Sequence, residues 1–352
     1  MELVFLKRST LAILDHAHVS DDFELVIDSV IYQKSNFVVN RTGIKAVVGD
    51  IVILRGTSYF YIGIIEAIEV KDEFQTKIET NDFTSIFDLK VPVGFYNGDV
   101  GSYLLSLISK TFKTNDDPLQ NLNYLTLSKS ASVYGTIFYE DNELKSITEV
   151  SELLAKTYGV RFNYSLIIDI DGRISGINVD IASVTSGLKI KSNLPCITSL
   201  EITESKSQVT NKVIFYPKSD NLTYTSIVGY YLLTNGTITN NKSNVDRFPY
   251  VKSTSAFYSD NEYSTLLTKA QSELLKSNLE HSIEFKVNMD NSIIIPFKNL
   301  KVGDFVEFVT DSKTYDTMVT QLSFKGNFYE CSVVLGEYRV KLTDKIKLLE
   351  RK

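Results

Sequence analysis

Two histidines near the amino terminus are the first residues whose type and spacing could carry chemistry. His16 and His18 are separated by one residue, so on a strand both imidazoles would share a face and could bind a metal ion. No third ligand follows nearby, and the chain has only three histidines. Two surface histidines are therefore the simpler interpretation, and we predict no metal site.

A short acidic segment resembles the opening of a calcium-binding loop. Residues 169–172 read Asp-Ile-Asp-Gly, but the twelfth position of such a loop holds Asp180 instead of glutamate. Ile174 and Ile177 also occupy places where ligands belong. The segment therefore predicts a hairpin turn, with Gly172 at positive φ.

Paired carboxylates for glycoside hydrolysis could come from Asp116 with Asp117, or from Asp22 with Glu24. Acidic pairs in polar loops are usually solvated, which favours a surface role. The sequence also lacks the Gly-x-Ser-x-Gly, Walker, Gly-x-Gly-x-x-Gly and His-Glu-x-x-His motifs. We therefore predict no catalytic residue and no cofactor, so the protein is not expected to be an enzyme.

The two cysteines are the remaining nucleophile candidates. Cys196 and Cys331 have no histidine nearby in the sequence, and His281 cannot be placed next to either one. Two cysteines do not form a disulfide framework, so buried structural thiols in a reducing cytoplasm are expected.

Composition limits the classes of function. The 352 residues include 43% hydrophobic residues and 20 each of tyrosine and phenylalanine, which supports a real core rich in strands. The net charge of −6 and the lack of Lys/Arg clusters argue against a duplex-binding protein or an oligonucleotide-binding barrel. No apolar stretch reaches 18 residues, and the amino terminus does not read as a signal peptide.

The elements that would position these residues follow a β, α/β, β order. Short apolar runs with polar boundaries fill the first ninety-odd residues and indicate a barrel or sandwich. A 3.6-residue stripe over residues 100–111 predicts a helix that a turn ending at Asp99 can cap. A capping box at Ser146 and Glu149 starts a second helix, which Gly159 ends.

A further insertion follows in the second half. We expect a hairpin at residues 235–236, then a capping box at Ser259 and Glu262 that starts a helix running toward residue 279. The expected domains are a first β-barrel (1–94), an α/β domain (95–194), a second β-barrel (195–217 and 281–352) and an inserted α/β subdomain (218–280).

An internal repeat links the two β-rich ends of the chain. Seven of the 26 residues from 49 to 74 reappear, without a gap, 254 positions later. The identical pairs are Gly49/Gly303, Asp50/Asp304, Val52/Val306, Ser58/Ser312, Tyr61/Tyr315, Lys71/Lys325 and Phe74/Phe328. A repeat this far apart is not a solenoid, and it indicates two copies of one small β-unit. A chance match stays open, because strand–turn–strand segments often share Gly-Asp turns.

We predict that the first three identical pairs of this repeat are structural residues that define the β-unit. They are Gly49, Asp50 and Val52 in the first copy and Gly303, Asp304 and Val306 in the second. The Gly-Asp pairs are most simply strand-entry turns, so these residues are expected to define the fold of the unit and not to react.

This order of parts resembles the central hub proteins of phage tails. That family includes the tail-associated (Tal) proteins of long non-contractile tails, baseplate hubs and type VI secretion spike proteins. The resemblance rests on residues 37–93 for barrel one and on 201–216 and 282–339 for barrel two. The individual passages that resemble this family are residues 48–53, 209–214, 319–326 and 335–339.

The resemblance implies an α+β, mainly β fold: two similar small antiparallel β-barrels separated by an α/β domain, with a helix-containing insertion in the second barrel. It also implies a homotrimer whose six barrels form a pseudo-sixfold ring. That ring would dock beneath hexameric tail proteins such as the distal tail ring, and genomic DNA would only pass through its channel.

The resemblance places the protein in the virion at the tail tip, after synthesis in the bacterial host cytoplasm. Many tail-associated relatives carry a carboxy-terminal peptidase or fibre, but this chain stops about a dozen residues after Arg339, so no wall-degrading activity is expected. The alternative function is a carbohydrate- or receptor-binding module for a host cell-surface glycan. Its candidate contact residues are Tyr224, Tyr230, Tyr231, Tyr250 and Tyr258.

Overall fold

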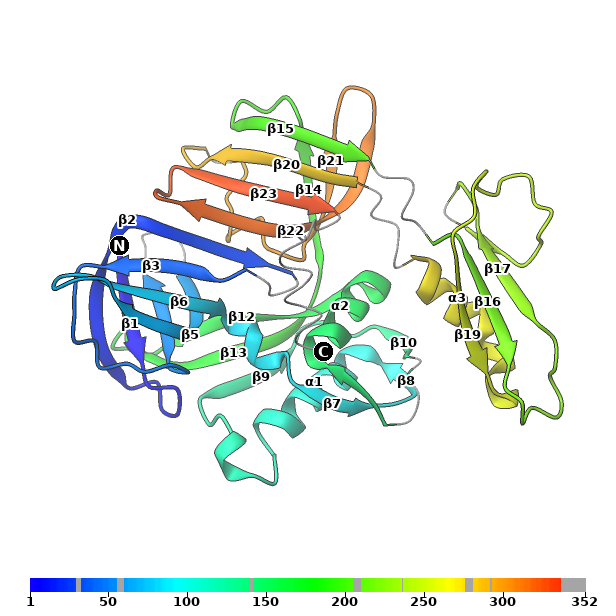
Figure 1. Ribbon diagram of the computed structural model, residues 1–352, viewed down its shortest axis with the longest axis horizontal. Helices are drawn as coiled ribbons and strands as arrows, with labels where there is room; N and C mark the ends of the chain where they lie inside the picture. Colours follow the sequence, from blue (N-terminus) through cyan, green and yellow to red (C-terminus); the bar gives the residue numbers. More distant parts are fainter. Residues whose placement is uncertain are drawn as a thin grey trace. The chain divides into compact units, whose positions relative to one another are not determined.

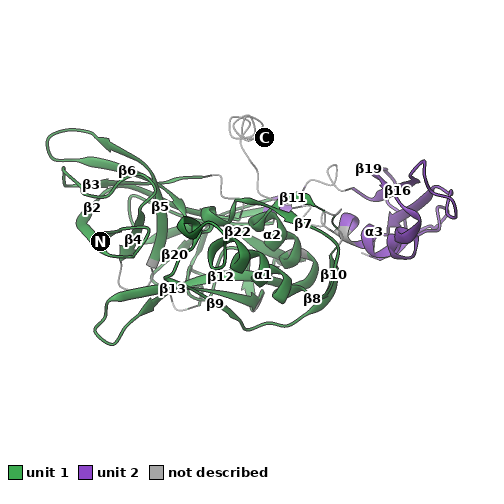
Figure 2. Cartoon of the chain, turned by 90° about the horizontal axis from the view of Figure 1, so that it is seen from below, with its two compact units in different colours: residues 1–202, 283–352 green, residues 203–282 purple. Residues whose placement is uncertain are grey.

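The chain forms two compact units, each with its own core. The computed structural model in Figure 1 describes residues 1–29, 33–55, 60–137, 139, 142–204, 210–235, 237–275, 281–291 and 293–336. Figure 2 colours the first unit, Met1–Ile202 with Ile283–Lys352, and the second, Thr203–Ser282. Among the described residues, no helix has both the length and the apolar character needed to cross a membrane.

Six antiparallel strands of the first unit close into a barrel. Their order is β1-β4-β5-β6-β3-β2, and β1 also pairs with β2. Buried and less buried residues alternate along β6, as a strand with one face on a core requires. The strands are β1 (Glu2–Leu6), β2 (Ile13–Asp28), β3 (Ser35–Val39), β4 (Ile51–Arg55), β5 (Phe60–Val70) and β6 (Thr76–Asp82).

A second sheet repeats most of this order. Its strands run β14-β21-β22-β23-β20-β15, so β21, β22, β23, β20 and β15 correspond to β4, β5, β6, β3 and β2. It departs from the barrel at β14, which pairs with β21 in parallel. The strands are β14 (Thr185–Lys191), β15 (Ile197–Glu204), β20 (His281–Asn288), β21 (Phe305–Val309), β22 (Thr314–Lys325) and β23 (Glu330–Gly336).

An α/β region lies between the two β-units in the sequence. Asp99 caps α1 (Val100–Phe112), a full capping box starts α2 (Ile147–Tyr158), and Gly159 ends α2 in the left-handed region, all as predicted. A sheet of order β12-β13-β9 and two antiparallel two-stranded sheets, β8 with β10 and β7 with β11, accompany them. The other elements are η1 (Phe83–Phe87), β7 (Lys90–Val93), β8 (Tyr96–Asp99), η2 (Pro118–Gln120), β9 (Leu125–Lys129), β10 (Tyr134–Ile137), β11 (Glu143–Ser146), β12 (Val160–Ile168) and β13 (Ile174–Ser183).

The second unit is a sheet of order β18-β17-β16-β19 with a helical segment. Its elements are β16 (Lys212–Pro217), β17 (Val228–Leu232), β18 (Ile238–Thr239), β19 (Ser253–Tyr258), η4 (Asp260–Thr265) and α3 (Leu266–Leu275). Ser259 N donates to Glu262 Oε2 at 2.7 Å at the start of η4. Residue 236 of the predicted hairpin and residue 279 of the predicted helix lie outside the described residues.

Two strands, β14 and β16, belong to other parts of the fold than the expected domain boundaries gave them. β16 falls in the segment 195–217 that we expected in the second barrel, but it pairs with β17 and β19 of the second unit. Val213 and Phe215 of β16 pack in the core that α3 completes, which explains the difference. β14 falls in the expected α/β domain but pairs with β21 in the second sheet.

The second unit has a core of its own, and we predict that its removal leaves the first unit folded. That core is formed by Val213, Phe215, Leu232, Tyr258, Leu266, Ala270 and Leu274. β15 and β20, which flank it, are neighbours in one sheet. We expect that replacing residues 205–280 by a short glycine-containing turn changes the melting temperature of the rest by less than about 4 °C, the equivalent of about 1 kcal/mol. Thermal melting followed by circular dichroism measures this, and an aggregated or unfolded product would contradict it.

Candidate functional site: the duplicated turn and the junction of the β-units

The two Gly-Asp turns have the same backbone conformation and hydrogen bonds. Gly49 and Gly303 have φ values of 91° and 85°, a region that side chains make unfavourable. Gly49 N donates to Ile65 O at 2.8 Å, and Gly303 N donates to Val319 O at 2.6 Å. The four residues keep the 254-residue offset of the repeat.

The aspartates close both turns in the same way. Asp50 N donates to Val47 O at 3.0 Å, while its Oδ2 accepts from Val47 N at 3.0 Å. Asp304 N donates to Lys301 O at 3.0 Å, and its Oδ2 accepts from Lys301 N at 2.9 Å. A short carboxylate can reach its own backbone three residues back, which explains why this residue type stands here.

The strands that follow these turns pair in the same register. Ile51 lies opposite Ile64, and Phe305 lies opposite Met318, again with the offset of 254. An irregularity between Ile65 and Ala67 in β5 recurs between residues 319 and 321 in β22. The duplication therefore extends over both strands and not only over the turn.

Val52 and Val306 both lie in the buried core, one residue into each hairpin. Tyr61 and Tyr315 are buried as well, and both belong to that same core. The identical pair Ser58/Ser312 cannot be compared, because Ser58 lies outside the described residues.

The two turns differ in the partner of their second carboxylate oxygen. Asp50 Oδ1 accepts from the backbone N of Arg8 at 3.1 Å. Asp304 Oδ1 instead accepts from Arg161 Nη2 at 2.9 Å, and the two side chains are only 13% and 15% exposed. Arg161 lies on β12, so this ion pair fastens the second sheet to the α/β region.

Burial governs the ionisation of this pair. It raises the pKa of the Asp304 carboxyl, and the Arg161 guanidinium opposes that rise. Burial likewise lowers the pKa of Arg161, which the charge of Asp304 counteracts. The guanidinium therefore favours the ionised form of the Asp304 carboxyl, and each charge compensates part of the cost of burying the other.

The first barrel and the second sheet are joined edge to edge. Residues 24–28 of β2 pair antiparallel with residues 321–325 of β22. The two strands lie side by side in Figure 1. The Phe23 ring stacks on Phe328 with centroids 4.5 Å apart, and Gly326 N donates to Phe23 O at 2.9 Å. One hydrophobic core runs through both β-units.

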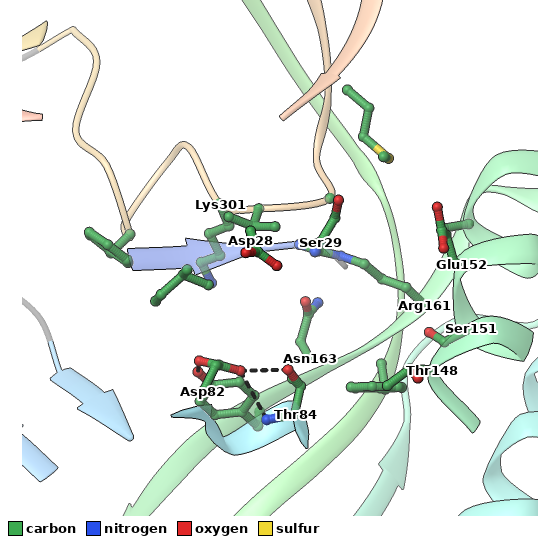
Figure 3. Close-up of a pocket in the computed structure, with 18 residues that line it drawn as sticks. Asp28, Ser29, Asp82, Thr84, Thr148, Ser151, Glu152, Arg161, Asn163 and Lys301 are labelled. Atoms are coloured by element: carbon green, nitrogen blue, oxygen red, sulfur yellow. Dashed lines mark hydrogen bonds between the residues drawn. The ribbon is translucent and has the colours of Figure 1, made fainter. Parts of the chain in front are cut away.

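A pocket of about 230 Å³ lies where the barrel, the second sheet and α2 meet (Figure 3). Thr148, Ser151 and Glu152 line it from α2, and Arg161 enters it from β12. The turn at residues 301–303 closes another side. Arg161, one of the charged residues that line it, is already paired with the Asp304 carboxylate, as expected of a residue that joins two parts of the fold.

Asp82 is a buried carboxyl at the edge of this pocket. Its Oδ1 accepts from Thr84 N at 2.9 Å and from Thr84 Oγ1 at 2.6 Å, and its Oδ2 accepts from Tyr164 OH at 2.5 Å. Burial nevertheless raises the pKa of Asp82, while these hydrogen bonds oppose the rise. Burial, with the nearby charge of Asp82, also raises the pKa of Tyr164 well above its ordinary value.

The raised pKa of Asp82 predicts a pH-dependent stability difference from Asp82→Asn. The folded wild type binds the proton more tightly than the unfolded chain does. Its stability relative to the variant is therefore greatest below the unfolded pKa, and it falls as the pH rises through the folded pKa, by at most about 1.4 kcal/mol per pH unit. Urea unfolding of both proteins between pH 4 and 8 measures the difference, and parallel profiles would contradict the prediction.

The histidine pair lies on the exposed face of β2, as its spacing suggested. His16 Nδ1 is 3.3 Å from Glu2 Oε1, and His18 is exposed. In the part of the chain that the structure describes, no group of three or more His, Cys, Asp or Glu side chains could hold a metal ion.

The acidic segments take structural positions. Gly172 has a φ of 76° in the hairpin between β12 and β13, which confirms the predicted turn. Asp117 Oδ1 accepts from Leu119 N at 3.0 Å and starts η2. Asp22 forms an exposed ion pair with Lys71 at 3.2 Å. These contacts bring no two candidate carboxylates together.

Both cysteines are buried free thiols, as predicted. Burial raises the pKa of the Cys331 thiol to about 12, so it stays protonated and unreactive at neutral pH. His281 is buried on β20. The thiols therefore contribute to packing.

The tyrosines of the second unit are mostly engaged in packing. Tyr258 is fully buried, and its OH donates to Ser226 O at 2.6 Å. Tyr231 is buried beneath Arg247, whose Cζ lies 4.0 Å from the ring centroid. Tyr224 is partly exposed and stacks on a neighbouring ring at 3.9 Å. Few of the predicted contact residues are thus free to meet a glycan.

No protein-family model matches the sequence, and the search of curated proteins gave no significant match. Solved structures do match over almost the whole chain. Prophage tail protein gp18 from Listeria monocytogenes EGD-e shares 13% identity, with a TM-score of 0.53, over 100% of this chain and 99% of that one. The 43 kDa tail protein of prophage MuSo2 from Shewanella oneidensis shares 11% identity, with a TM-score of 0.55, over 96% and 98%.

A further match is a chain from the p2 virion baseplate in its activated conformation. It shares 13% identity, with a TM-score of 0.53, and 97% of this chain and 99% of that one are covered. At these identities the likeness shows a common fold. The resemblance to phage tail and baseplate hub proteins is therefore confirmed as a likeness of fold, as is the α+β, mainly β class.

Proposed function

We propose that this chain is the structural hub of a bacteriophage tail tip or baseplate. Three copies would form a pseudo-sixfold ring that joins the hexameric tail to the threefold tip and surrounds the DNA channel. The proteins that share its fold are tail and baseplate components, which supports a structural tail role.

The duplicated turn carries this proposal. Two hairpins in one chain share their turn, register and irregularity, so each copy offers two similar modules. Three such chains present six modules, and cyclic assembly can arrange them around one axis. A protein with six similar modules in three chains can match a hexamer on one side and a threefold tip on the other.

The partners follow from this geometry. The ring would contact hexameric tail proteins such as the distal tail ring, in the virion, after synthesis in the host cytoplasm. Genomic DNA would pass through without being held, and the net charge of −6 suits a channel that repels phosphates. We propose no enzymatic role. The Arg161 guanidinium at the junction of the β-units is paired with Asp304, which suits a structural contact.

The domain boundaries of the hub remain part of the proposal. We keep residues 1–94 for the first barrel and 281–352 for the second β-unit. From the expected segments 95–194 and 195–217, we count β14 in the second β-unit and β16 in the insertion.

A receptor-binding role for the second unit is a second candidate. Apolar side chains that stand largely exposed on this unit favour it: Leu222, Ile227, Val245, Val251 and Phe257. Glycan-array binding by the full chain, lost on Phe257→Ala and absent from the chain without residues 205–280, would support it. Binding that persists after this excision would exclude the second unit.

The hub is tested by its assembly. We expect analytical ultracentrifugation over a wide concentration range to show a monomer–trimer equilibrium, shifted to the trimer by a purified hexameric tail ring. Electron microscopy of the complex should show six similar densities around the axis. A protein that stays monomeric at high concentration and beside the tail ring would overturn the proposal.

A further inference from the structure

The carboxy-terminal half of β5 has an edge that no strand covers in the part of the chain that the structure describes. β4 pairs with β5 only as far as Ile64, and the Gly-Asp turn then bonds to residue 65. β6 covers the opposite edge as far as Val70. The backbone of residues 67–70 therefore presents one side without a ladder partner among the described strands, a template for an added strand.

The second copy of the repeat shows which kind of strand pairs with such an edge. Residues 321–325 of β22 are the counterparts of residues 67–71, at the offset of 254. In β22 that edge is filled by residues 24–28 of β2, in antiparallel pairing. The first barrel thus has the same edge as the second sheet, without the strand that covers it.

Side-chain exposure gives an independent indication of the same missing cover. Phe324 is 1% exposed beneath β2, whereas its counterpart Val70 is 63% exposed. Phe328 stacks on the Phe23 ring, with an interplanar angle of 16°, whereas its counterpart Phe74 is 75% exposed. Val70 and Phe74 are thus exposed, whereas their counterparts in the second β-unit, Phe324 and Phe328, are covered by β2 and Phe23.

The strand that corresponds to β2 in the second sheet is β15. β2 pairs with β3, and β15 is the neighbour of β20, the counterpart of β3. The same contact marks both pairs: Asn40 N donates to His18 O at 3.2 Å, and Asn288 N donates to Cys196 O at 2.9 Å.

The outer edge of β15 also has no ladder partner among the described strands. β15 ends the order of its sheet, and no described strand lies on its other side. Most of its side chains are exposed or half-buried, and Leu200 is 38% exposed at its centre. Within the described part of the chain, β15 and the end of β5 are therefore two strand edges without a ladder partner.

We infer that β15 of one copy pairs with residues 67–71 of a second copy, and that the strand covers Val70 and Phe74. The contact repeats between chains the pairing that β2 and β22 make within one chain. It rests on the proposed ring, for which it names the surface that joins one subunit to the next. Its strength comes from backbone hydrogen bonds and two buried apolar side chains.

A disulfide trap tests the contact directly. Phe74→Cys with Leu200→Cys places thiols on both open edges, and the native cysteines are buried. Mild oxidation is expected to give covalent species that stop at three chains on a denaturing gel. Each single-cysteine variant lacks the second thiol of this contact and should remain a single chain. Leu119→Cys with Leu200→Cys, which uses an exposed residue of η2, should not form the ladder.

Charge substitutions supply a second measurement. Phe74→Asp and Val70→Asp alter exposed side chains, so the monomer should keep its circular dichroism spectrum and melting temperature. We expect self-association to weaken at least tenfold in the ultracentrifuge. Leu119→Asp, a change at another exposed apolar residue, should leave the association constant within about twofold.

The outcomes separate this inference from the proposed function. A trimer that forms without cross-linking, and that tolerates Phe74→Asp, would overturn the strand pairing and leave the hub standing. Cross-linked ladders that continue beyond three chains would support the pairing and overturn the threefold ring. Absence of both cross-links and association, at high concentration and beside a tail ring, would overturn both.

Discussion

Replacing Arg161 with methionine is expected to lower the free energy of unfolding by about 3–5 kcal/mol, because it leaves the buried Asp304 carboxylate without its cation. The guanidinium and the carboxylate lie 2.9 Å apart, and neither side chain is exposed by more than 15%. Methionine keeps most of the packing volume, so the loss would measure the uncompensated charge more than a cavity. Urea unfolding followed by circular dichroism gives the change in midpoint.

An exposed ion pair between two neighbouring strands of the second sheet, β14 and β21, provides the control. Lys189 Nζ lies 3.0 Å from Glu307 Oε2, with side chains 56% and 50% exposed. Because solvent screens such a pair, Lys189→Met is expected to cost about 1 kcal/mol or less. Equal losses for the two methionine variants would show that burial does not govern the Arg161 pair.

A second substitution separates charge from shape. Asp304→Asn keeps an oxygen that can accept from Lys301 N, so the turn can still close. Combined with Arg161→Met, it removes the buried charge that the single variant leaves behind. The double variant is expected to recover most of the loss, and a double variant no more stable than Arg161→Met would contradict the electrostatic explanation.

The features that the sequence predicted correctly are those that short-range chemistry determines. Ser146 and Glu149 cap a helix within one turn of chain, and Gly172 supplies a positive φ that its hairpin requires. The Gly-Asp turns are equally local, because each aspartate bonds to a residue three positions earlier. Such signals need no knowledge of the tertiary fold.

The parts that the sequence did not predict depend on distant partners. Arg161 and Asp304 are 143 positions apart, and a single arginine in a strand gives no sign of the carboxylate it will meet. β14 has only Leu188 and Ile190 as apolar residues, and β16 is a short apolar run. Both patterns would suit several sheets, so neither could identify the partner strand. The buried Asp82 was missed for the same reason, since its burial comes from packing by the α/β region.

The two repeat glycines are expected to differ sharply when each is changed to alanine. Both have positive φ, so a side chain alone should cost about 1–2 kcal/mol at either position. At Gly49 a Cβ atom would meet nothing within 4 Å. At Gly303 it would overlap the guanidinium of Arg161 and force that side chain away from Asp304. Gly303→Ala should therefore cost up to about 3 kcal/mol more than Gly49→Ala, since it also breaks a buried ion pair.

A double-mutant cycle identifies the origin of that excess. If Gly303→Ala acts through the ion pair, combining it with Arg161→Met should cost much less than the sum of the two single changes, with a coupling of about 2–3 kcal/mol. Gly49→Ala combined with Arg161→Met should be additive, because no contact links the first turn to that arginine in the described structure. Additive behaviour in both cycles would mean that the strain of positive φ alone explains both glycines. The contact between the second turn and the α/β region would then contribute nothing to the stability lost on Gly303→Ala.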